Sequence, residues 1–366
     1  MKEEPTEKAV VAGFRTAHVE WGDTDDPYIE LARLAETSGA RVVAVVTQKE
    51  TRPTVQFYIG PGKVAEIREA IEEMEADLVI FNNELSPLQF RNLEKELGVK
   101  VIDRTQLILD IFAMRAQSNE GKIQVELAQL EYLLPRIVGR GVELSRLGGG
   151  IGTRGPGETK LESDRRRIRD RISTLKKKLE KVEKNRLIQK QRRERARVPV
   201  LSLVGYTNAG KTTLFNALSK EKAFVEDKLF ATLDPLTRKI YIEGVGNALL
   251  VDTVGFIKNL PVHLVESFKS TLEGVRDASV LLHVVDVSNP QYQEQMDEVD
   301  RIISELGATK VPYLLVFNKI DRVGNSERLD HLLRLHPGAV AISAKKEREF
   351  ADLKKAVRQK LTEIKY

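Results

Sequence analysis

Apolar residues in the first hundred positions follow two alternating patterns. Short apolar runs at 9–14, 41–47, 77–82 and 100–104 predict β-strands. Between them, the three- and four-residue spacing typical of helices occurs at 26–39, 62–76 and 86–98. Strands that alternate with helices favour a parallel sheet with right-handed crossovers. We therefore expect a small α/β domain over residues 1–104.

The pattern then becomes helical. Residues 105–136 predict one long helix, although Gly121 lies in its middle. A second helical segment follows a glycine-rich stretch. Its apolar residues are separated by one step of seven residues and then by alternating steps of four and three: Leu161, Ile168, Ile172, Leu175, Leu179 and Val182. Such a seam needs a partner helix, most simply the one before the glycines, and Pro199 ends the segment. We expect a two-helix domain over 105–197, with a glycine-rich loop at 148–159.

From residue 198 onward the α/β alternation returns. Apolar runs at 198–205, 279–286, 312–317 and 339–343 predict strands, and 238–244 with 248–255 predict a hairpin. Helical spacing at 289–307 and 350–365 lies between and after these strands. The third expected domain, 198–366, is a larger doubly wound α/β sheet.

Composition and charge narrow the possible classes. The chain of 366 residues has no cysteine, which excludes disulfides and thiolate metal sites. No apolar run reaches the roughly 18 residues of a membrane span, and the N-terminus lacks a secretory signal. We expect a cytoplasmic monomer, with a peripheral position at the membrane as the alternative. Residues 160–197 hold 17 Lys or Arg against 6 Asp or Glu, which suggests an anionic partner such as nucleic acid.

The sharpest motif is the sequence GYTNAGKT at 205–212. It fits GxxxxGK[ST] between an apolar strand and a helix, which is the context of a phosphate-binding loop. Backbone N–H groups and the helix N-terminus attract phosphate there. In this interpretation Lys211 reaches the β- and γ-phosphates, and the Thr212 hydroxyl binds Mg²⁺.

Later motifs identify the base as guanine. Asp321, in the sequence NKID at 318–321, can accept two hydrogen bonds from the guanine edge, whereas adenine would leave it unpaired. The sequence SAK at 343–345 follows another strand, where a backbone amide can meet guanine O6. NKID alone is more often a plain turn. Four motifs in order, each at the carboxyl end of a strand, predict a GTPase.

Two segments between these motifs are candidates for switches. Asp252 and Gly255 lie in the sequence DTVG. In this interpretation the Asp252 carboxylate holds Mg²⁺ through water, and the Gly255 amide binds the γ-phosphate. Thr232, in the sequence FATLDPLTR, is our choice for the hydroxyl that completes Mg²⁺ coordination; the alternative is that it only ends a loop. Phe256 stands where many signalling GTPases place a glutamine that orients water, so unaided hydrolysis should be slow.

These motifs define the expected site of GTP or GDP with Mg²⁺. The predicted nucleotide-binding residues are Gly205, Tyr206, Thr207, Asn208, Ala209, Gly210, Lys211, Thr212, Thr213, Asp252, Asn318, Lys319, Asp321, Ser343, Ala344 and Lys345. The predicted catalytic residues are Lys211, Thr232 and Gly255, and the predicted Mg²⁺ ligands are Thr212, Thr232 and, through water, Asp252.

The G-domain motifs, together with the sequences LDIFAMRAQSNEGKIQVELAQLEY and GGGIGTRGPGETKLESDRRRIRDRI, resemble the HflX family of translational GTPases. The resemblance runs from about residue 8 to 345. It implies an N-terminal α/β subdomain, a two-helix subdomain and a G domain. It also implies binding to the large ribosomal subunit and dissociation of stalled or idle ribosomes, with the loop 148–159 pushed toward the peptidyl transferase centre.

Basic residues of the second helical segment are the expected contacts to ribosomal RNA. They are Arg154, Lys160, Arg165, Arg166, Arg167, Arg169 and Arg171. The alternative is a solvent-exposed charged helix beneath a flexible loop. Two rival functions stay open at this point: a signalling GTPase whose arm binds protein or anionic lipid, and an RNA-remodelling ATPase.

Overall fold

The computed structural model describes residues 7–15, 27–49, 52–139, 160–220, 228–258, 260–261, 264, 268–324, 326–347 and 349–364. The chain divides into two compact units, one of residues 1–114 and 122–179 and the other of residues 115–121 and 180–366. The three-part division 1–104, 105–197 and 198–366 stays a prediction. Within the described part, no helix has the length and apolar character that crossing a membrane requires.

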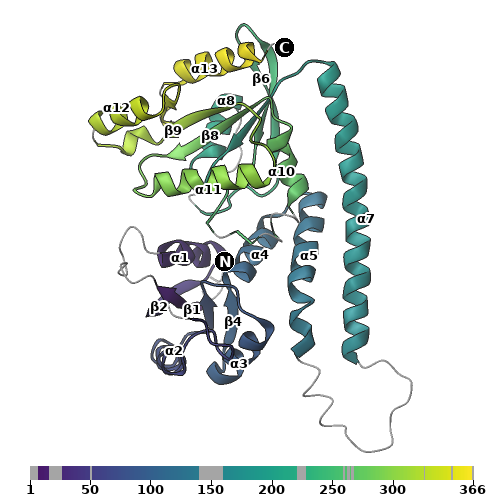
Figure 1. Cartoon of the computed structure of the whole chain (residues 1–366), viewed down its shortest axis with the longest axis vertical. Coiled ribbons are helices and arrows are strands. Elements are labelled where there is room, and N and C mark those ends of the chain that lie inside the picture. Colours follow the sequence, from purple (N-terminus) through teal and green to yellow (C-terminus); the bar gives the residue numbers. More distant parts are fainter. Residues whose placement is uncertain are drawn as a thin grey trace, which may run out of the picture. The chain divides into compact units, whose positions relative to one another are not determined.

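The first unit contains the parallel sheet expected at its N-terminal end. Its strands are β1 (Lys8–Arg15), β2 (Arg41–Lys49), β3 (Leu78–Phe81) and β4 (Lys100–Asp103), in the order β2-β1-β3-β4. Helices α2 (Pro61–Met74) and α3 (Pro87–Leu97) cover one face, and α1 (Pro27–Ser38) covers the other (Figure 1). Val10 and Val79 are fully buried against α2 and α3. The predicted α/β class is confirmed here.

Helices α2 and α3 begin at residues suited to that position. The sequence IGPGK at 59–63 is a turn in which Gly60 precedes α2 and Pro61 opens it. Ser86 accepts a hydrogen bond from the Gln89 amide, and the Gln89 side chain accepts one from the Ser86 amide. This capping box and Pro87 fix the start of α3.

The single long helix predicted over 105–136 is wrong. The structure has two helices there, α4 (Arg104–Arg115) and α5 (Asn119–Leu133), followed by a 3-10 turn at Arg136–Gly139. The break has a physical cause, because the amides of Gln117 and Ser118 donate to the carboxylate of Asp234. These two N–H groups therefore bind a residue more than a hundred positions away in the chain, instead of a carbonyl within a helix.

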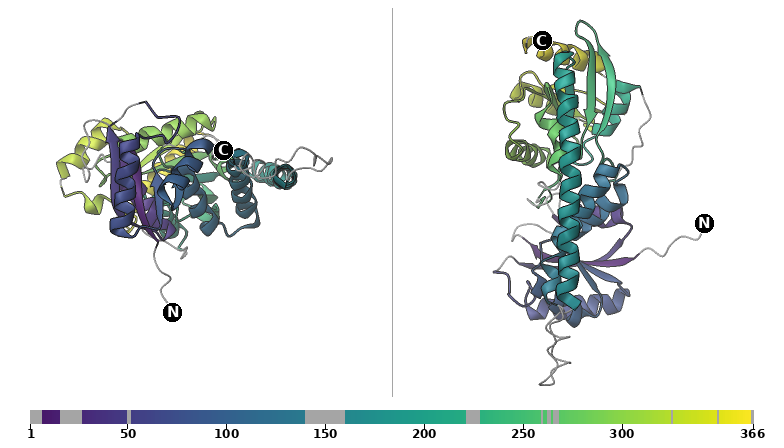
Figure 2. Two further views of the ribbon diagram at one scale, coloured as in Figure 1. Left: turned by 90° about the horizontal axis from the view of Figure 1, so that it is seen from below. Right: turned by 90° about the vertical axis from the view of Figure 1, so that its right-hand side faces the viewer.

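The second helical segment forms one continuous helix, α7 (Lys160–Arg195), which Figure 2 shows as an unbroken coil. Of its predicted seam, Leu175 is fully buried, and Ile168, Ile172, Leu179 and Val182 are partly buried, whereas the side chain of Leu161 lies outside the described part. Within the first unit, Arg171 pairs with Glu126 and Lys176 with Glu131, both on α5. The predicted pairing of these helices is confirmed. Because these ion pairs lie at the surface, the apolar seam supplies most of the stabilisation.

The second unit contains a six-stranded sheet in the order β10-β9-β8-β5-β7-β6. Its strands are β5 (Val200–Val204), β6 (Leu236–Ile242), β7 (Gly246–Asp252), β8 (Val280–Asp286), β9 (Tyr313–Asn318) and β10 (Val340–Ala341). The expected hairpin is the antiparallel pair β6–β7, and the other strand pairs are parallel. The sheet is therefore doubly wound, as predicted, with one antiparallel edge strand.

Helices cover both faces of this sheet (Figure 1). Helices α8 (Lys211–Ser219) and α13 (Phe350–Glu363) pack on one face, where Phe215 and Leu353 are buried. Helices α11 (Tyr292–Glu305) and α12 (Ser326–Leu335) pack on the other through Met296 and Leu332. The sequence analysis did not predict α12 or α10 (Lys269–Arg276).

Candidate nucleotide site

The loop between β5 and α8 has the tight path that phosphate binding requires. Gly205 has a φ of +151°, and a Cβ there would lie 2.3 Å from the carbonyl oxygen of Val284. Gly210 has a φ of +94°, and a Cβ there would lie 2.3 Å from the side-chain nitrogen of Asn318. Only glycine fits either position, so the loop can pass close to neighbouring strands before it enters α8.

Lys211 opens α8 and is almost completely buried, with 6% of its surface exposed. Its ammonium donates to the carbonyl oxygens of Gly205 at 3.1 Å and Tyr206 at 2.8 Å. Burial lowers the pKa of Lys211 to about 8; the charge of Asp252 opposes this shift and that of Lys319 adds to it. A bound polyphosphate would favour the charged ammonium, so the loop presents a cation suited to phosphate.

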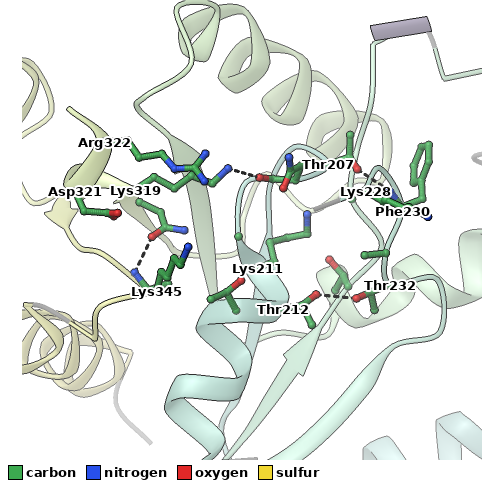
Figure 3. Close-up of a pocket in the computed structure, with 18 residues that line it drawn as sticks. Thr207, Lys211, Thr212, Lys228, Phe230, Thr232, Lys319, Asp321, Arg322 and Lys345 are labelled. Atoms are coloured by element: carbon green, nitrogen blue, oxygen red, sulfur yellow. Dashed lines mark hydrogen bonds between the residues drawn. The ribbon is translucent and has the colours of Figure 1, made fainter. Parts of the chain in front are cut away.

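Three oxygen-bearing side chains converge next to Lys211. The hydroxyl oxygens of Thr212 and Thr232 are 2.7 Å apart (Figure 3). Thr212 donates to Asp252 Oδ2 at 2.7 Å. Thr232 lies 3.3 Å from the same carboxylate oxygen. Burial raises the pKa of Asp252, opposed mainly by the hydrogen bond from Thr212 and the charge of Lys211. The other oxygen of Asp252, Oδ1, is buried and accepts no hydrogen bond within the described structure.

The predicted base-reading residues meet at the carboxyl ends of β9 and β10. Ser343 donates to Asp321 Oδ1 at 2.6 Å, and this bond is the main cause that holds the pKa of Asp321 below its usual value. Asn318 donates to the Ala209 carbonyl at 2.9 Å and accepts from the Ala344 amide at 2.9 Å. The carboxylate of Asp321 is thus ionised and oriented by its neighbours.

Lys319 connects the same region to the phosphate loop. Its ammonium donates to the Asn208 carbonyl at 2.8 Å and to Asp286 at 2.6 Å. Asp286 ends β8 and was not among the residues that the sequence analysis selected. Through these contacts, side chains from three neighbouring strands and the phosphate loop form one rigid edge.

Gly255 and Phe256 lie against the phosphate loop. The amide of Phe256 donates to Gly205 at 3.1 Å, and its carbonyl accepts from Thr207 at 2.7 Å. The Phe256 ring is buried, with 1% of its surface exposed. A Cβ on Gly255 would lie 2.7 Å from the Thr207 Cα, so this close pairing requires glycine. Phe256 therefore packs this segment onto the phosphate loop.

These elements surround one cavity of about 280 Å³ (Figure 3). The predicted residues that line it are Thr207, Asn208, Gly210, Lys211, Thr212, Thr213, Thr232, Gly255, Asn318, Lys319, Asp321, Ala344 and Lys345. Five others lie behind this lining and support it: Gly205, Tyr206, Ala209, Asp252 and Ser343. The structure thus brings all the predicted nucleotide residues together.

Five further lining residues were not selected from the sequence: Lys228, Phe230, Ala231, Thr253 and Arg322. Phe230 is buried, and its amide donates to the Thr207 hydroxyl at 2.8 Å. Its place two residues before Thr232 was the available signal. Lys228 lies in none of the sequence motifs, and Arg322 could have been found only as the residue that follows NKID.

The predicted RNA-binding residues lie on α7 or just before it. Arg166, Arg167 and Arg169 are exposed, Arg165 is partly buried, and Arg171 makes two hydrogen bonds to Glu126. Lys160 is the first residue of α7, but its side chain lies outside the described part. Arg154 and the loop 148–159 also lie outside the described residues. Within the described part, no cluster of three or more His, Asp or Glu could hold a metal.

The second unit, a doubly wound sheet with this cavity at the carboxyl ends of its strands, has the fold and site of a P-loop GTPase. The chain belongs to the HflX GTPase family. It is 57% identical over 292 residues to the GTPase HflX of Caldanaerobacter subterraneus subsp. tengcongensis, covering 80% of this chain and 68% of that protein. It is 46% identical over 334 residues to the GTPase HflX of Escherichia coli, covering 91% and 78%.

Family comparisons and solved structures agree with this assignment. Residues 25–113 match the family described as GTP-binding GTPase N-terminal, 115–193 its middle region, and 200–319 the family described as 50S ribosome-binding GTPase. A crystal structure of a GTP-binding protein from Sulfolobus solfataricus with GDP is 28% identical, with a TM-score of 0.50, and covers 98% of this chain and 99% of that one. A second GDP complex, of SsGBP, is 29% identical with a TM-score of 0.53, and covers 98% and 100%.

Proposed function

We propose that this GTPase uses Mg²⁺, binds the large ribosomal subunit, and promotes dissociation of stalled or idle ribosomes into subunits, with GTP hydrolysis timing its release. The observation that carries the enzymatic part is that Lys211, Thr212 and Asp321 line the same cavity. Family membership and the basic helix α7 support the ribosomal part. This function requires a cytoplasmic protein.

Each end of the cavity has a defined task in this proposal. Asp321, ionised and oriented by Ser343, accepts hydrogen bonds from the N1–H and N2–H₂ edge of guanine. The amides of the phosphate loop and the Lys211 ammonium bind the phosphates. The amide of Gly255 is the proposed contact to the γ-phosphate, and the close approach of this residue to Thr207 and Lys211 supports that role. GDP or GTP would therefore be held along the carboxyl edge of the sheet.

The donor set beside Lys211 fits Mg²⁺. Mg²⁺ prefers oxygen ligands and usually keeps several waters, and two threonine hydroxyls and one carboxylate meet here. The buried Asp252 Oδ1, which lacks a hydrogen-bond partner in the described structure, is available to a metal-bound water. When bound, the ion would neutralise charge on the β- and γ-phosphates. Thr212 and Thr232 would hold it directly and Asp252 through water.

Unaided hydrolysis should be slow, because Phe256 carries no group that can orient water. The ring is also committed to packing, since it is buried and its backbone pairs with Gly205 and Thr207. A partner must therefore reshape this segment or supply the missing group. We assign that role to the large ribosomal subunit.

Helix α7 is the proposed contact to ribosomal RNA. Arg166, Arg167 and Arg169 are exposed, so they can reach phosphates, and the ion pair of Arg167 with Asp164 is exposed and costs little to break. Arg171 must first exchange its ion pair with Glu126, an exposed pair that costs little to break. The glycine-rich loop 148–159 precedes this helix and is the proposed wedge that separates the subunits.

The decisive experiment measures GTPase rate with and without purified large subunits, together with co-sedimentation in the presence of a non-hydrolysable GTP analogue. We expect stimulation and co-sedimentation that weaken steeply as salt rises. The triple variant Arg166→Ala, Arg167→Ala, Arg169→Ala should lower both. A matched control, Lys354→Ala with Lys355→Ala, removes exposed charge from α13 instead and should change neither. Absence of both stimulation and co-sedimentation would refute the ribosomal part.

A second experiment separates binding from splitting. Replacement of residues 148–159 by a short Gly-Ser linker should keep ribosome binding and lose subunit dissociation. Light scattering of intact ribosomes reports the dissociation. If splitting persists, this loop is not the wedge. If binding is salt-insensitive and directed at protein or anionic lipid vesicles instead, the signalling GTPase alternative is favoured.

A further inference from the structure

Thr232 lies in a short segment that is held at both ends. At one end, the Phe230 amide donates to the Thr207 hydroxyl of the phosphate loop at 2.8 Å. At the other end, Asp234 is bound by residues that precede helix α5. Leu233, between Thr232 and Asp234, is buried with 3% of its surface exposed. Fixing both ends restricts where the Thr232 hydroxyl can lie.

Asp234 makes three hydrogen bonds to the linker between α4 and α5. Its Oδ2 accepts from the amides of Gln117 and Ser118, both at 2.8 Å, and its Oδ1 accepts from the Ser118 hydroxyl. That same hydroxyl oxygen accepts from the Gly121 amide at 2.9 Å, so Ser118 caps α5. A carboxylate at a helix N-terminus is also favoured by the helix dipole. The contact is therefore built for an acidic residue.

Gly121 makes room for this contact. A Cβ at position 121 would lie 2.3 Å from Asp234 Oδ1 and 3.1 Å from the Ser118 hydroxyl oxygen. Glycine inside a helix is unfavourable compared with alanine, and no left-handed backbone angle requires it here. The close approach of the Asp234 carboxylate explains why this helix carries a glycine.

The start of α5 is itself anchored within the same unit. Glu120 pairs with Arg186 of α7 at 2.8 Å, and both side chains are partly buried. Lys190, one turn further along α7, pairs with Asp277 at 2.6 Å. Gln117 and Ser118 therefore belong to a fixed support rather than a free loop end.

We propose that Asp234 is a positioning residue for GTP hydrolysis. By binding Gln117 and Ser118, it holds Thr232 beside Thr212 and Asp252, and it makes the start of α5 part of the GTPase site. The reverse follows by linkage: when Thr232 leaves its place after hydrolysis, the cap of α5 is strained or released. This inference rests on the role proposed for Thr232 but is independent of ribosome binding.

The sharpest test is Gly121→Ala, because it pushes the Asp234 carboxylate away without changing any residue that lines the nucleotide cavity. We expect kcat without ribosomes to fall about tenfold, since misplacement by about 1 Å can cost more than that. Affinity for the non-hydrolysable analogue GMPPNP with Mg²⁺ should fall several-fold. Affinity for GDP should stay unchanged, because Thr232 acts only on the triphosphate state.

Four further variants complete the design. Gly274→Ala, on α10, is the matched control, because a Cβ there meets nothing closer than 3.8 Å and should leave all values unchanged. Asp234→Ala should reproduce Gly121→Ala, and the double variant should be no worse than either, because both remove one contact. Thr232→Ala should lower the GMPPNP-to-GDP affinity ratio at least as much.

The outcomes separate the claims. If Gly121→Ala and Asp234→Ala leave kcat and the affinity ratio unchanged while Thr232→Ala lowers them, Asp234 does not position Thr232. If both variants weaken GDP and GMPPNP equally and lower Tm, the contact is only structural, and the proposal is overturned. If Thr232→Ala itself has no effect, the role proposed for Thr232 is wrong and this inference fails with it.

Discussion

Asn318 joins the base-reading end of the cavity to the phosphate loop by donating a 2.9 Å hydrogen bond to the carbonyl oxygen of Ala209. Its side-chain oxygen accepts at the same time from the Ala344 amide at 2.9 Å. Asn318 is buried, with 2% of its surface exposed. One amide side chain therefore fixes the distance between the elements that hold phosphate and base.

Asn318→Ala should weaken both GDP and GTP. Two buried backbone groups lose their partners, and each such loss costs about 1–3 kcal/mol. Isothermal titration calorimetry should show the loss for both nucleotides alike, because the residue acts on the frame of the cavity. Asn289→Ala, at an asparagine in the turn before α11, is the control and should bind normally. Loss of GTP binding alone would contradict this account.

Asp321→Asn should change the base that the site prefers. The amide replaces an acceptor by a donor, so it suits the 2-oxo group of xanthine rather than the 2-amino group of guanine. We expect GTP affinity to fall by about 10²-fold or more while XTP becomes a substrate. Ser343→Ala keeps the carboxylate and should weaken GTP without admitting XTP. Equal hydrolysis of GTP and XTP by the unaltered protein would disprove the assignment.

His283 should make folding stability depend on pH. It lies in β8 with 1% of its surface exposed, and burial, helped by the charge of Lys211, lowers its pKa to about 4. Asp300 lies 3.6 Å from Nδ1 but does not offset the burial, and Nε2 has no hydrogen-bond partner in the described structure.

The linkage between protonation of His283 and folding gives the direction in which stability changes with pH. Because the pKa in the folded state is below the value of the unfolded state, the stability is present above about pH 6.5 and is lost as pH falls toward 4, by about 3 kcal/mol. His283→Leu should remove this loss, which urea unfolding at several pH values can measure. His331→Leu, at an exposed histidine, is the control. Parallel stability curves for the unaltered protein and His283→Leu would contradict the prediction.

Phe256→Ala should destabilise the second unit by about 3–5 kcal/mol, because it leaves a cavity behind a fully packed ring. Phe256→Leu should cost less than about 1.5 kcal/mol if its neighbours repack. Denaturant unfolding measures both values, and GTPase assays without ribosomes should stay slow for the unaltered protein and for Phe256→Leu. A rapid unaided rate would show that another residue orients the water.

Local pattern was sufficient for most elements of this fold. The strands of both sheets, the α5–α7 pairing and the phosphate loop follow from residue spacing, because burial on one face and the steric needs of a tight turn leave a periodic signature. Helices α10 and α12 were missed: they are short, so they carry few turns of periodicity.

The sequence by itself determined the class of this protein, since the motifs around Lys211, Asp252 and Asp321 are contiguous and each follows a strand. Only the tertiary structure decided what joins them. The hydrogen bonds of Asn318 to Ala209 and of Ser343 to Asp321 link residues far apart in the chain. The break between α4 and α5 has the same origin: Gln117 and Ser118 give their amides to Asp234, and a local pattern cannot record a partner that only folding brings near.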